Sequence, residues 1–537
     1  MSRQRIDVPV WGAVMVVALL TCLAYGNSFG GLFVMDDISE IELNPAMRTL
    51  FPPWQAMFVG RMLPARPLPY LTFAIDYSLG GPYPFGYHVT NLVIHMTSAL
   101  ALFVFARLTF LSPRLKGIYG DRAAILAAII AIVWAVHPLQ TQAVTYVYQR
   151  IESLTGMLCL LALLAFAQAA ARDWSTRWLV CCIVSTAAAM ASKENAVVLP
   201  FLIASYDWLF CGDGLAGFKR RRWLYAGLAA TWVILGLFLA SQSGRYGEFQ
   251  RPTHDPIAYA LTQPRVILHY LRLAAVPSPL CFDYIWRTAE TWSEFLPSLV
   301  YLLILLAVTA AGAARQRPWS WLGLAFFLTL APTSSVMPVV SLAAEHRMYL
   351  PLAAFVATVV LLGDWVLQRQ LARQAGARTA LMVATAILVG LWTTGLIAMT
   401  RARNEVYAEP GGIWLDVLAK QPTSTRAIWN LAATCEKLGE IDVALRYADE
   451  CFALNPRLPV FLDIAAERRK TGDIAGAMRI LQHGLAQYRA MPTPHEPTIV
   501  ELSTRLDTEL HQLTSPGDAG KAVASEQKPI PGHSTGP

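Results

Sequence analysis

The chain has 537 residues, of which 55% are hydrophobic and 15% are charged, and its mean hydropathy is +0.43. This composition excludes an ordinary soluble globular protein and is typical of a polytopic membrane protein. The net charge of +7 would suit a nucleic-acid-binding protein. In a membrane protein, however, basic residues hold the cytoplasmic loops in place, so we expect no nucleic-acid partner. The eight cysteines form no Cys-x-x-Cys pair, which predicts small core residues and not a disulfide framework or a zinc site.

The N-terminus has a basic start and a long apolar run, which predicts a retained signal anchor. A helix needs about 20 apolar residues to cross the hydrocarbon core of a bilayer. The stretch 257–276 is largely apolar but contains Pro264, Arg265 and Arg272, so we predict an interfacial or re-entrant helix there. The eleven runs predicted as spans are 9–27, 89–110, 123–138, 151–171, 177–192, 195–210, 223–241, 295–314, 319–335, 348–367 and 379–399.

Charge in the loops predicts the orientation of these spans. With eleven spans and the N-terminus in the cytoplasm, every short basic loop, such as "FKRRRW" at 218–223, faces the cytoplasm. Counting 257–276 as a span would place the last two basic loops outside. We therefore expect an integral protein of a bacterial inner membrane, whose active site and C-terminal part are periplasmic.

The first outer loop, 28–88, carries the adjacent carboxylates Asp36 and Asp37 in "GGLFVMDDISE". Carboxylates close to membrane depth are costly and often functional. A positioned carboxylate can act as the general base that activates a hydroxyl group. Both are therefore catalytic candidates; we favour Asp36 as the base, and a solvated loop pair is the alternative.

Other polar residues gather at the outer ends of the spans, whereas the cytoplasmic loops contain basic residues and few other polar ones. His88 and Asn91 share one helical face. Cations near the membrane surface would stabilise a phosphate leaving group. The candidate substrate-binding residues are Arg66, His88, Asn91, Arg150, Lys193, Glu194, Asp283, Glu345, His346 and Arg347.

Each of these candidates also has a structural interpretation. Hydrogen bonding inside the bundle would explain His88, a local ion pair would explain Lys193 and Glu194, and snorkelling would explain Arg347. His137 precedes a proline at the end of an apolar run, which favours a helix cap over a ligand role.

After Arg401 the composition changes, and two segments, 427–456 and 460–488, repeat a pattern with glycines 33 residues apart. The pattern L-A-x-x-x-x-x-x-G-x-x-x-x-A predicts tetratricopeptide repeats, which bind peptides or pack on neighbours. We expect a repeat domain over 401–512, preceded by a membrane domain over 1–400. The polar tail 513–537 is rich in Pro, Gly and Ser, which predicts disorder.

The ordered set "FVMDD", "RPLPYLTFAIDY", "GYHVTNLVIH", "VHPLQTQAVTYVYQRIESL", "SKENAVVLP" and "EHRMYLP", followed by the repeats, resembles the transmembrane and tetratricopeptide-repeat O-mannosyltransferases and their bacterial relatives. These are enzymes of the GT-C glycosyltransferase superfamily. The resemblance implies an all-α membrane bundle, a polyprenyl-phosphate sugar donor, an outer acceptor hydroxyl and inversion at the sugar. The family's acidic pair falls on Asp36 and Asp37, and its Glu-x-Arg-x-Tyr-Leu-Pro element falls on Glu345 and Arg347. The animal proteins carry many more repeats, so the acceptor class does not carry over.

The sequence therefore predicts an inverting glycosyltransferase that moves a sugar from a polyprenyl phosphate to a hydroxyl, on a protein or a glycan that the repeats would dock. A divalent ion, Mg²⁺ or Mn²⁺, stays open as a cofactor, although no dense carboxylate set is visible. The alternatives are an oligosaccharide ligase or polymerase, a membrane scaffold, and a lipid-glycan transporter. A transporter should have polar residues near span centres, and here they cluster at the outer ends.

Overall fold

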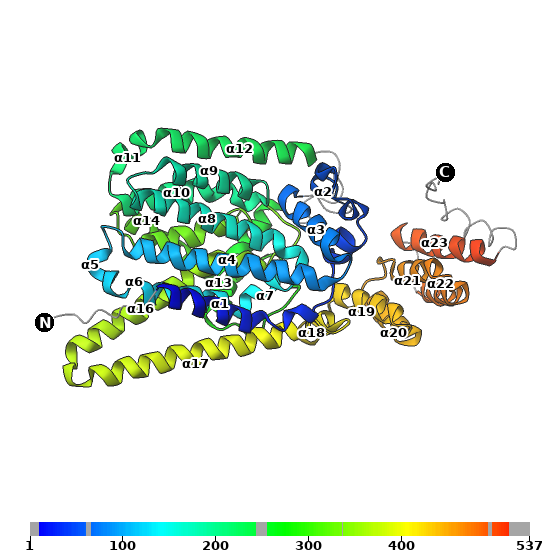
Figure 1. Cartoon of the computed structure of the whole chain (residues 1–537). Helices are drawn as coiled ribbons and strands as arrows, with labels where there is room; N and C mark the ends of the chain where they lie inside the picture. The colour runs from blue at the N-terminus through cyan, green and yellow to red at the C-terminus, as the bar shows by residue number, and fades with distance from the viewer. Residues whose placement is uncertain (1–9, 61–65, 243–254, 336, 492–496, 515–537) are drawn as a thin grey trace, which may run out of the picture. The chain divides into compact units, whose positions relative to one another are not determined.

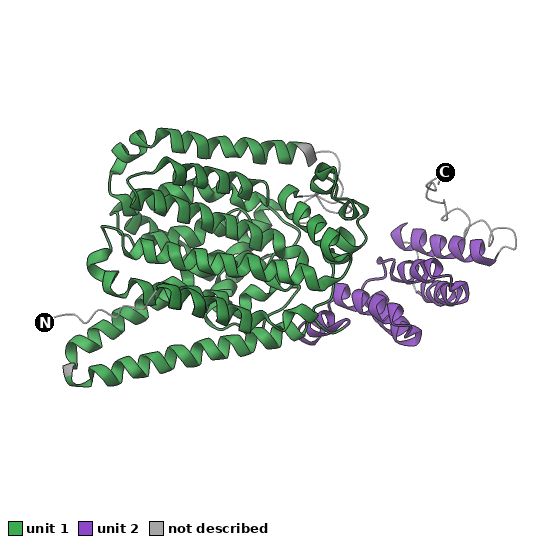
Figure 2. Ribbon diagram, in the orientation of Figure 1, with its two compact units in different colours: residues 1–409 green, residues 410–537 purple. Residues whose placement is uncertain are grey.

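The computed structural model describes residues 10–60, 66–242, 255–335, 337–491 and 497–514. Every regular element in these ranges is helical (Figure 1), which confirms the all-α class. The chain divides into two compact units, Met1–Glu409 and Pro410–Pro537 (Figure 2).

The helices of the first unit follow the apolar runs, and several begin with a proline, whose missing N–H costs nothing in a first turn. The α-helices are α1 (Val10–Tyr25), α2 (Pro53–Phe58), α3 (Pro67–Gly80), α4 (Pro84–Phe110), α5 (Lys116–Tyr119), α6 (Ala123–Ala135), α7 (Thr141–Val144), α8 (Arg150–Ala171), α9 (Thr176–Met190), α10 (Leu199–Tyr206), α11 (Gly214–Arg220), α12 (Arg222–Gln242), α13 (Pro256–Ala275), α14 (Trp292–Ala314), α15 (Ser320–Leu330), α16 (Pro351–Arg373) and α17 (Arg378–Glu405).

Within the described residues, eight helical stretches are long and apolar enough to cross a membrane, and they match eight of the eleven predicted spans. The chain is that of an integral membrane protein. The other three runs form α9, α10 and α15, α-helices of 15, 8 and 11 residues, each shorter than the roughly 17–25 residues that a span requires. The stretch predicted as interfacial or re-entrant forms α13, which is not among the eight. Orientation across a membrane stays a prediction. The eight stretches are Val10–Gly30, Pro84–Phe110, Lys116–Ala135, Val147–Ala171, Arg222–Ala240, Trp292–Ala314, Pro351–Arg373 and Arg378–Glu405.

The core of the first unit lies where α4, α6 and α8 pack together (Figure 1). The indole N–H of Trp134 donates to the carbonyl of Tyr349 at 2.9 Å, which joins α6 to the start of α16. A side chain at Gly156 would lie 2.5 Å from the Tyr349 ring, so glycine permits this close approach. The first turn of α16, and the residues just before it, are therefore held firmly against the core.

The second unit contains α18 (Gly412–Lys420) to α23 (Pro497–Thr514), and its core lies between successive amphipathic helices. Gly439 and Gly472 have φ of +84° and +82° and end α19 (Thr425–Lys437) and α21 (Val460–Lys470). Glycine takes this left-handed conformation without steric cost. At each glycine the chain therefore turns back into the next helix, which is α20 (Ile441–Leu454) after Gly439 and α22 (Ile474–Arg489) after Gly472. The tetratricopeptide assignment stays a prediction. The predicted tail, 513–537, begins with the last two residues of α23 and otherwise lies outside the described residues.

Candidate active site

The two adjacent carboxylates of the first loop have different surroundings. Asp37 is fully buried, and its carboxylate accepts hydrogen bonds from the backbone N–H groups of Val34, at 3.0 Å, and Tyr148, at 2.6 Å. Burial raises the pKa of Asp37 well above its usual value, although these hydrogen bonds oppose the shift. Asp36 is half-buried, and its backbone N–H donates to the Tyr146 hydroxyl at 3.0 Å. Asp37 thus ties the loop to the start of α8, and Asp36 is the carboxylate of the pair that a substrate can approach.

Aromatic hydroxyls surround this loop, and sequence reasoning missed them. The Tyr70 hydroxyl donates to the buried Glu40 carboxylate at 2.9 Å and lies 3.3 Å from the Tyr148 hydroxyl. Burial, followed by the charges of Asp36 and Asp37, raises the pKa of Tyr146 well above its usual value, so this hydroxyl stays protonated. The spacing of the tyrosines in "TYVYQR" was the available signal, but tyrosine next to an apolar run also indicates an ordinary interfacial anchor.

A basic group lies beside these tyrosines. Arg66 and Asp36 both interact electrostatically with the Tyr148 hydroxyl. The Arg66 guanidinium binds the Glu194 carboxylate through two hydrogen bonds, of 2.9 and 3.3 Å. Burial opposes the shift, but the Arg66 charge lowers the pKa of Glu194 to about 2, so this pair is ionised at neutral pH. Next to it, the Lys193 ammonium contacts the Glu152 carboxylate at 2.5 Å.

Three cations act on His346. Burial, followed by the charges of Lys193, Arg347 and Arg66, lowers the pKa of His346 well below its usual value, so the ring is neutral at physiological pH. Its backbone N–H donates to the Gln142 side-chain oxygen at 2.8 Å. Segments far apart in the sequence thus converge at one place. We call the half-exposed residues among them the polar cluster: Asp36, Arg66, Glu194 and His346.

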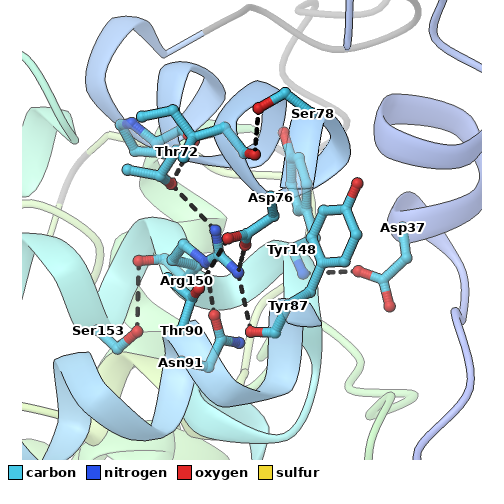
Figure 3. A network of polar contacts seen from close by, with 12 residues as sticks. Asp37, Thr72, Asp76, Ser78, Tyr87, Thr90, Asn91, Tyr148, Arg150 and Ser153 are labelled. Atoms are coloured by element: carbon cyan, nitrogen blue, oxygen red, sulfur yellow. Dashed lines mark hydrogen bonds and ion pairs between the residues drawn. The ribbon is translucent and has the colours of Figure 1, made fainter. Parts of the chain in front are cut away.

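Arg150 lies in a network inside the protein (Figure 3). Its side chain is fully buried, and the guanidinium contacts the Asp76 carboxylate at 2.6 Å and the Asn91 side-chain oxygen at 2.5 Å. It also donates to the Tyr87 carbonyl at 2.9 Å and to the Thr72 hydroxyl at 3.2 Å. These contacts join α3, α4 and α8, so the geometry favours a positioning role for Arg150 and Asn91 over substrate contact.

Two other candidates, Glu345 and Arg347, hold loops in place, and a third, Asp283, lies on one of those loops. The buried Glu345 carboxylate accepts hydrogen bonds from the Cys281 backbone N–H and the Tyr284 hydroxyl, both at 2.6 Å. Asp283 is half-buried on the same segment. The Arg347 guanidinium donates to three backbone carbonyls, among them Ser341 at 2.5 Å. The structure therefore places Glu345 and Arg347 behind the polar cluster and not in it.

Two histidines bind backbone groups. The His88 ring contacts the Gly31 carbonyl at 3.0 Å and anchors the first loop to α4. The His137 ring accepts from the Leu139 backbone N–H at 3.2 Å, at the start of a 3-10 turn, which confirms the predicted cap. Burial lowers the pKa of His137 to about 4. Among the described residues, no group of three or more His, Cys, Asp or Glu side chains could hold a metal ion, so the Mg²⁺ or Mn²⁺ alternative has no candidate ligand set there.

Comparison with known proteins gives one consistent result, although no protein-family model matches the chain. A protein O-mannosyl-transferase of Caenorhabditis elegans is 25% identical over 363 residues, which are 64% of this chain and 50% of that protein. The protein O-mannosyl-transferase TMTC4 of Mus musculus is 31% identical over 237 residues, 40% of this chain and 31% of that protein. The protein O-mannosyl-transferase tmtc2 of Xenopus laevis is 28% identical over 349 residues, 57% of this chain and 40% of that protein.

The chain spans half or less of the length of these relatives. Among solved structures, ArnT from Cupriavidus metallidurans bound to undecaprenyl phosphate covers 93% of this chain, with 16% identity and a TM-score of 0.40. The curated relatives confirm the resemblance seen in the sequence motifs: over the part of their length that it matches, this chain is similar to the TMTC protein O-mannosyl-transferases.

Proposed function

We propose that the first unit is an inverting glycosyltransferase of the GT-C type, which moves a sugar from a polyprenyl-phosphate donor to a hydroxyl group. The relatives are named protein O-mannosyl-transferases, which supports a sugar donor and a protein acceptor. The observation that carries the proposal is the polar cluster, in which the half-buried Asp36 carboxylate and the Arg66 guanidinium both lie within electrostatic reach of one tyrosine hydroxyl.

This geometry fits the chemistry of sugar transfer. Asp36 would accept the proton of the acceptor hydroxyl as that oxygen forms its bond to the anomeric carbon. The bond from that carbon to the phosphate oxygen breaks, and the negative charge moves to the phosphate. Arg66, with Lys193 close to it, would stabilise the developing charge. The Nδ1–H of neutral His346 donates to the Gln142 side-chain oxygen at 3.1 Å, so its Nε2 is left to accept a hydrogen bond from a sugar hydroxyl.

The second unit would guide the macromolecular acceptor. Its helix pairs resemble short peptide-binding repeats, and two and a half repeats are long enough for a peptide segment. We place this unit and Asp36 on the periplasmic side. A reporter fused after residue 510 tests the side: alkaline phosphatase should be active there and green fluorescent protein dark, and the reverse pattern would contradict the placement.

Transfer itself is tested with purified full-length protein and a panel of radiolabelled polyprenyl-phosphate monosaccharides. Asp36→Asn should abolish transfer and still bind donor, whereas Glu42→Gln, a half-buried carboxylate a few residues later, should keep wild-type turnover. Wild-type turnover by Asp36→Asn would eliminate the proposed base. No transfer from any donor would favour a scaffold or a transporter.

A further inference from the structure

Helices of the first unit enclose an apolar cavity that the proposed reaction does not use. It has a volume of about 440 Å³ and lies between α4, α6, α8, α10, α15 and α16. Phe105, Leu163, Ala325 and Ala357 are among the side chains that line it. An apolar cavity of about 150 Å³ already binds benzene, so this one has room for a hydrocarbon chain of many carbons.

The two ends of the cavity differ. At the inner end, Leu202 and Leu350 separate it from a second space of about 20 Å³, which Glu152 and Arg347 line. That space has room for about one water molecule, so no hydrocarbon chain passes through it into the cavity. At the other end, Ile118 and Trp319 also line the cavity and are 58% and 53% exposed. A ligand therefore enters at this end, which we call the mouth.

The mouth is positively charged. Arg114 and Arg317 line it, and no Asp or Glu is present among the described lining residues. The Arg114 guanidinium is already held by the carbonyls of Leu209 and Gln316, so its position is fixed, whereas Arg317 is exposed. A planar guanidinium matches the geometry of a phosphate group, and an exposed tryptophan such as Trp319 is typical of the level of lipid head groups.

A second observation points to a ligand. The indole N–H of Trp321 is buried and has no hydrogen-bond partner within the described part of the chain, although Trp321 lines the cavity four residues after Arg317. A buried donor without an acceptor is costly. In a phospholipid, an ester carbonyl lies between the phosphate and the acyl chain, and such an oxygen would accept this hydrogen bond.

We propose that the cavity binds one acyl chain of an anionic phospholipid, with the phosphate at Arg114 and Arg317 and an ester carbonyl at Trp321. The lipid enters from the leaflet at the mouth. It is a structural lipid, separate from the sugar donor, because the cavity runs from Leu350 beside the start of α16 to Leu361, about 16 Å away, and Arg122 joins Asp364, past that far end, to Ile118 at the mouth.

Native mass spectrometry of the delipidated full-length protein tests this site, with phosphatidylglycerol and phosphatidylcholine of identical acyl chains as probes. We expect one tightly bound phosphatidylglycerol. Arg317→Gln should weaken its binding about tenfold or more, because a charge-assisted hydrogen bond is lost. Arg315→Gln, an exposed arginine that does not line the cavity, should have no effect.

A cavity-filling variant tests the position of the acyl chain. Ala357→Phe should abolish the bound lipid, whereas Val359→Phe, at an exposed position of the same helix, should not. Equal binding of the two phospholipids, or equal loss in Arg315→Gln and Arg317→Gln, would overturn the proposal. So would displacement of phosphatidylglycerol by polyprenyl phosphate, since the cavity would then belong to the donor. None of these measurements depends on sugar transfer, so they fail or succeed independently of the proposed enzyme activity.

Discussion

Replacing Arg150 separates a positioning role from a role in substrate binding. The Arg150 guanidinium lies 4.7 Å from the centre of the Phe73 ring and pairs with Asp76, which is only 6% exposed. Arg150→Met removes the cation and leaves the Asp76 carboxylate buried with the Thr90 hydroxyl as its remaining side-chain donor among the described contacts. Arg150→Lys keeps a charge but loses the planar fork that reaches Asn91 and Thr72 together.

The magnitudes follow from these contacts. Breaking a buried ion pair by removing one partner costs about 3–5 kcal/mol, so we expect this loss for Arg150→Met. Arg150→Lys gives up charge-assisted hydrogen bonds worth roughly 1.5–3 kcal/mol each and should cost about 2–3 kcal/mol after partial relaxation. A double variant, Arg150→Met with Asp76→Leu, removes both charges and should recover about 2 kcal/mol or more relative to the sum of the single losses.

The assay is the apparent melting temperature of purified protein in detergent, followed by intrinsic fluorescence, together with donor affinity at a temperature where each variant is folded. A loss of 1 kcal/mol shifts the midpoint by about 2–4 °C for 150–250 residues and by less for a larger unit, so Arg150→Met should melt roughly 5–10 °C lower. Donor affinity of folded Arg150→Lys should equal that of the wild type. A wild-type melting temperature for Arg150→Met, or a tenfold loss of donor affinity in folded Arg150→Lys, would refute the reasoning.

Three further changes test the surroundings of the polar cluster. Asp37→Asn turns an NH₂ group toward one of two backbone N–H donors and should cost about 1–3 kcal/mol, measured as a lower melting temperature. Because the pKa of His137 is lowered to about 4, the unfolded chain binds a proton there as pH falls below about 6.5. Proton binding at His137 in the unfolded chain should therefore lower the free energy of unfolding by about 2 kcal/mol between pH 7.5 and 5. His137→Gln should reduce the acid-induced fall in melting temperature. The Arg66 pair lowers the pKa of Glu194 to about 2, so its contribution is complete above about pH 4.5. The fall in melting temperature caused by Glu194→Gln should then be the same at pH 5 and pH 8. A difference between these two values would contradict an ionised Arg66–Glu194 pair.

Eight spans could be predicted from the sequence because a helix that crosses a bilayer leaves a run of about 20 apolar residues. The runs 177–192, 195–210 and 319–335 show the limit of this signal. A helix too short to cross a bilayer can also consist almost entirely of apolar residues, so composition alone does not distinguish it from a span. Locally, Lys193 precedes the 3-10 turn that leads into α10, and Asp207, which pairs with Arg221 at 2.6 Å, begins the π-helical turn that continues α10.

The candidate residues could be predicted by type and by their place along the spans, but not by what their side chains contact. Arg150 has the charge that a phosphate site requires, yet its contacts are with Asp76 and other groups of the protein. Tyr146 has no charge and stands beside an apolar run, and the structure places its hydroxyl against Asp36. Contacts between residues far apart in the sequence decide both cases, and one sequence alone does not reveal such contacts.

The adjacent polar pairs follow one rule. Successive side chains point about 100° apart in an α-helix and to opposite sides of an extended segment, such as the one at Lys193, so two neighbouring polar side chains face different surroundings. In each pair, one side chain is buried and bonded to another segment of the protein, and its neighbour is half-exposed. The buried member fixes the backbone, and the backbone aims its neighbour at the polar cluster. Burying a carboxylate or a cation costs desolvation free energy. In return, the buried residue holds the adjacent functional residue in a defined position. Substituting the buried members should therefore disturb stability first, whereas substituting the half-exposed members should disturb transfer first; the pairs are Asp37 with Asp36, Lys193 with Glu194, and Arg347 with His346.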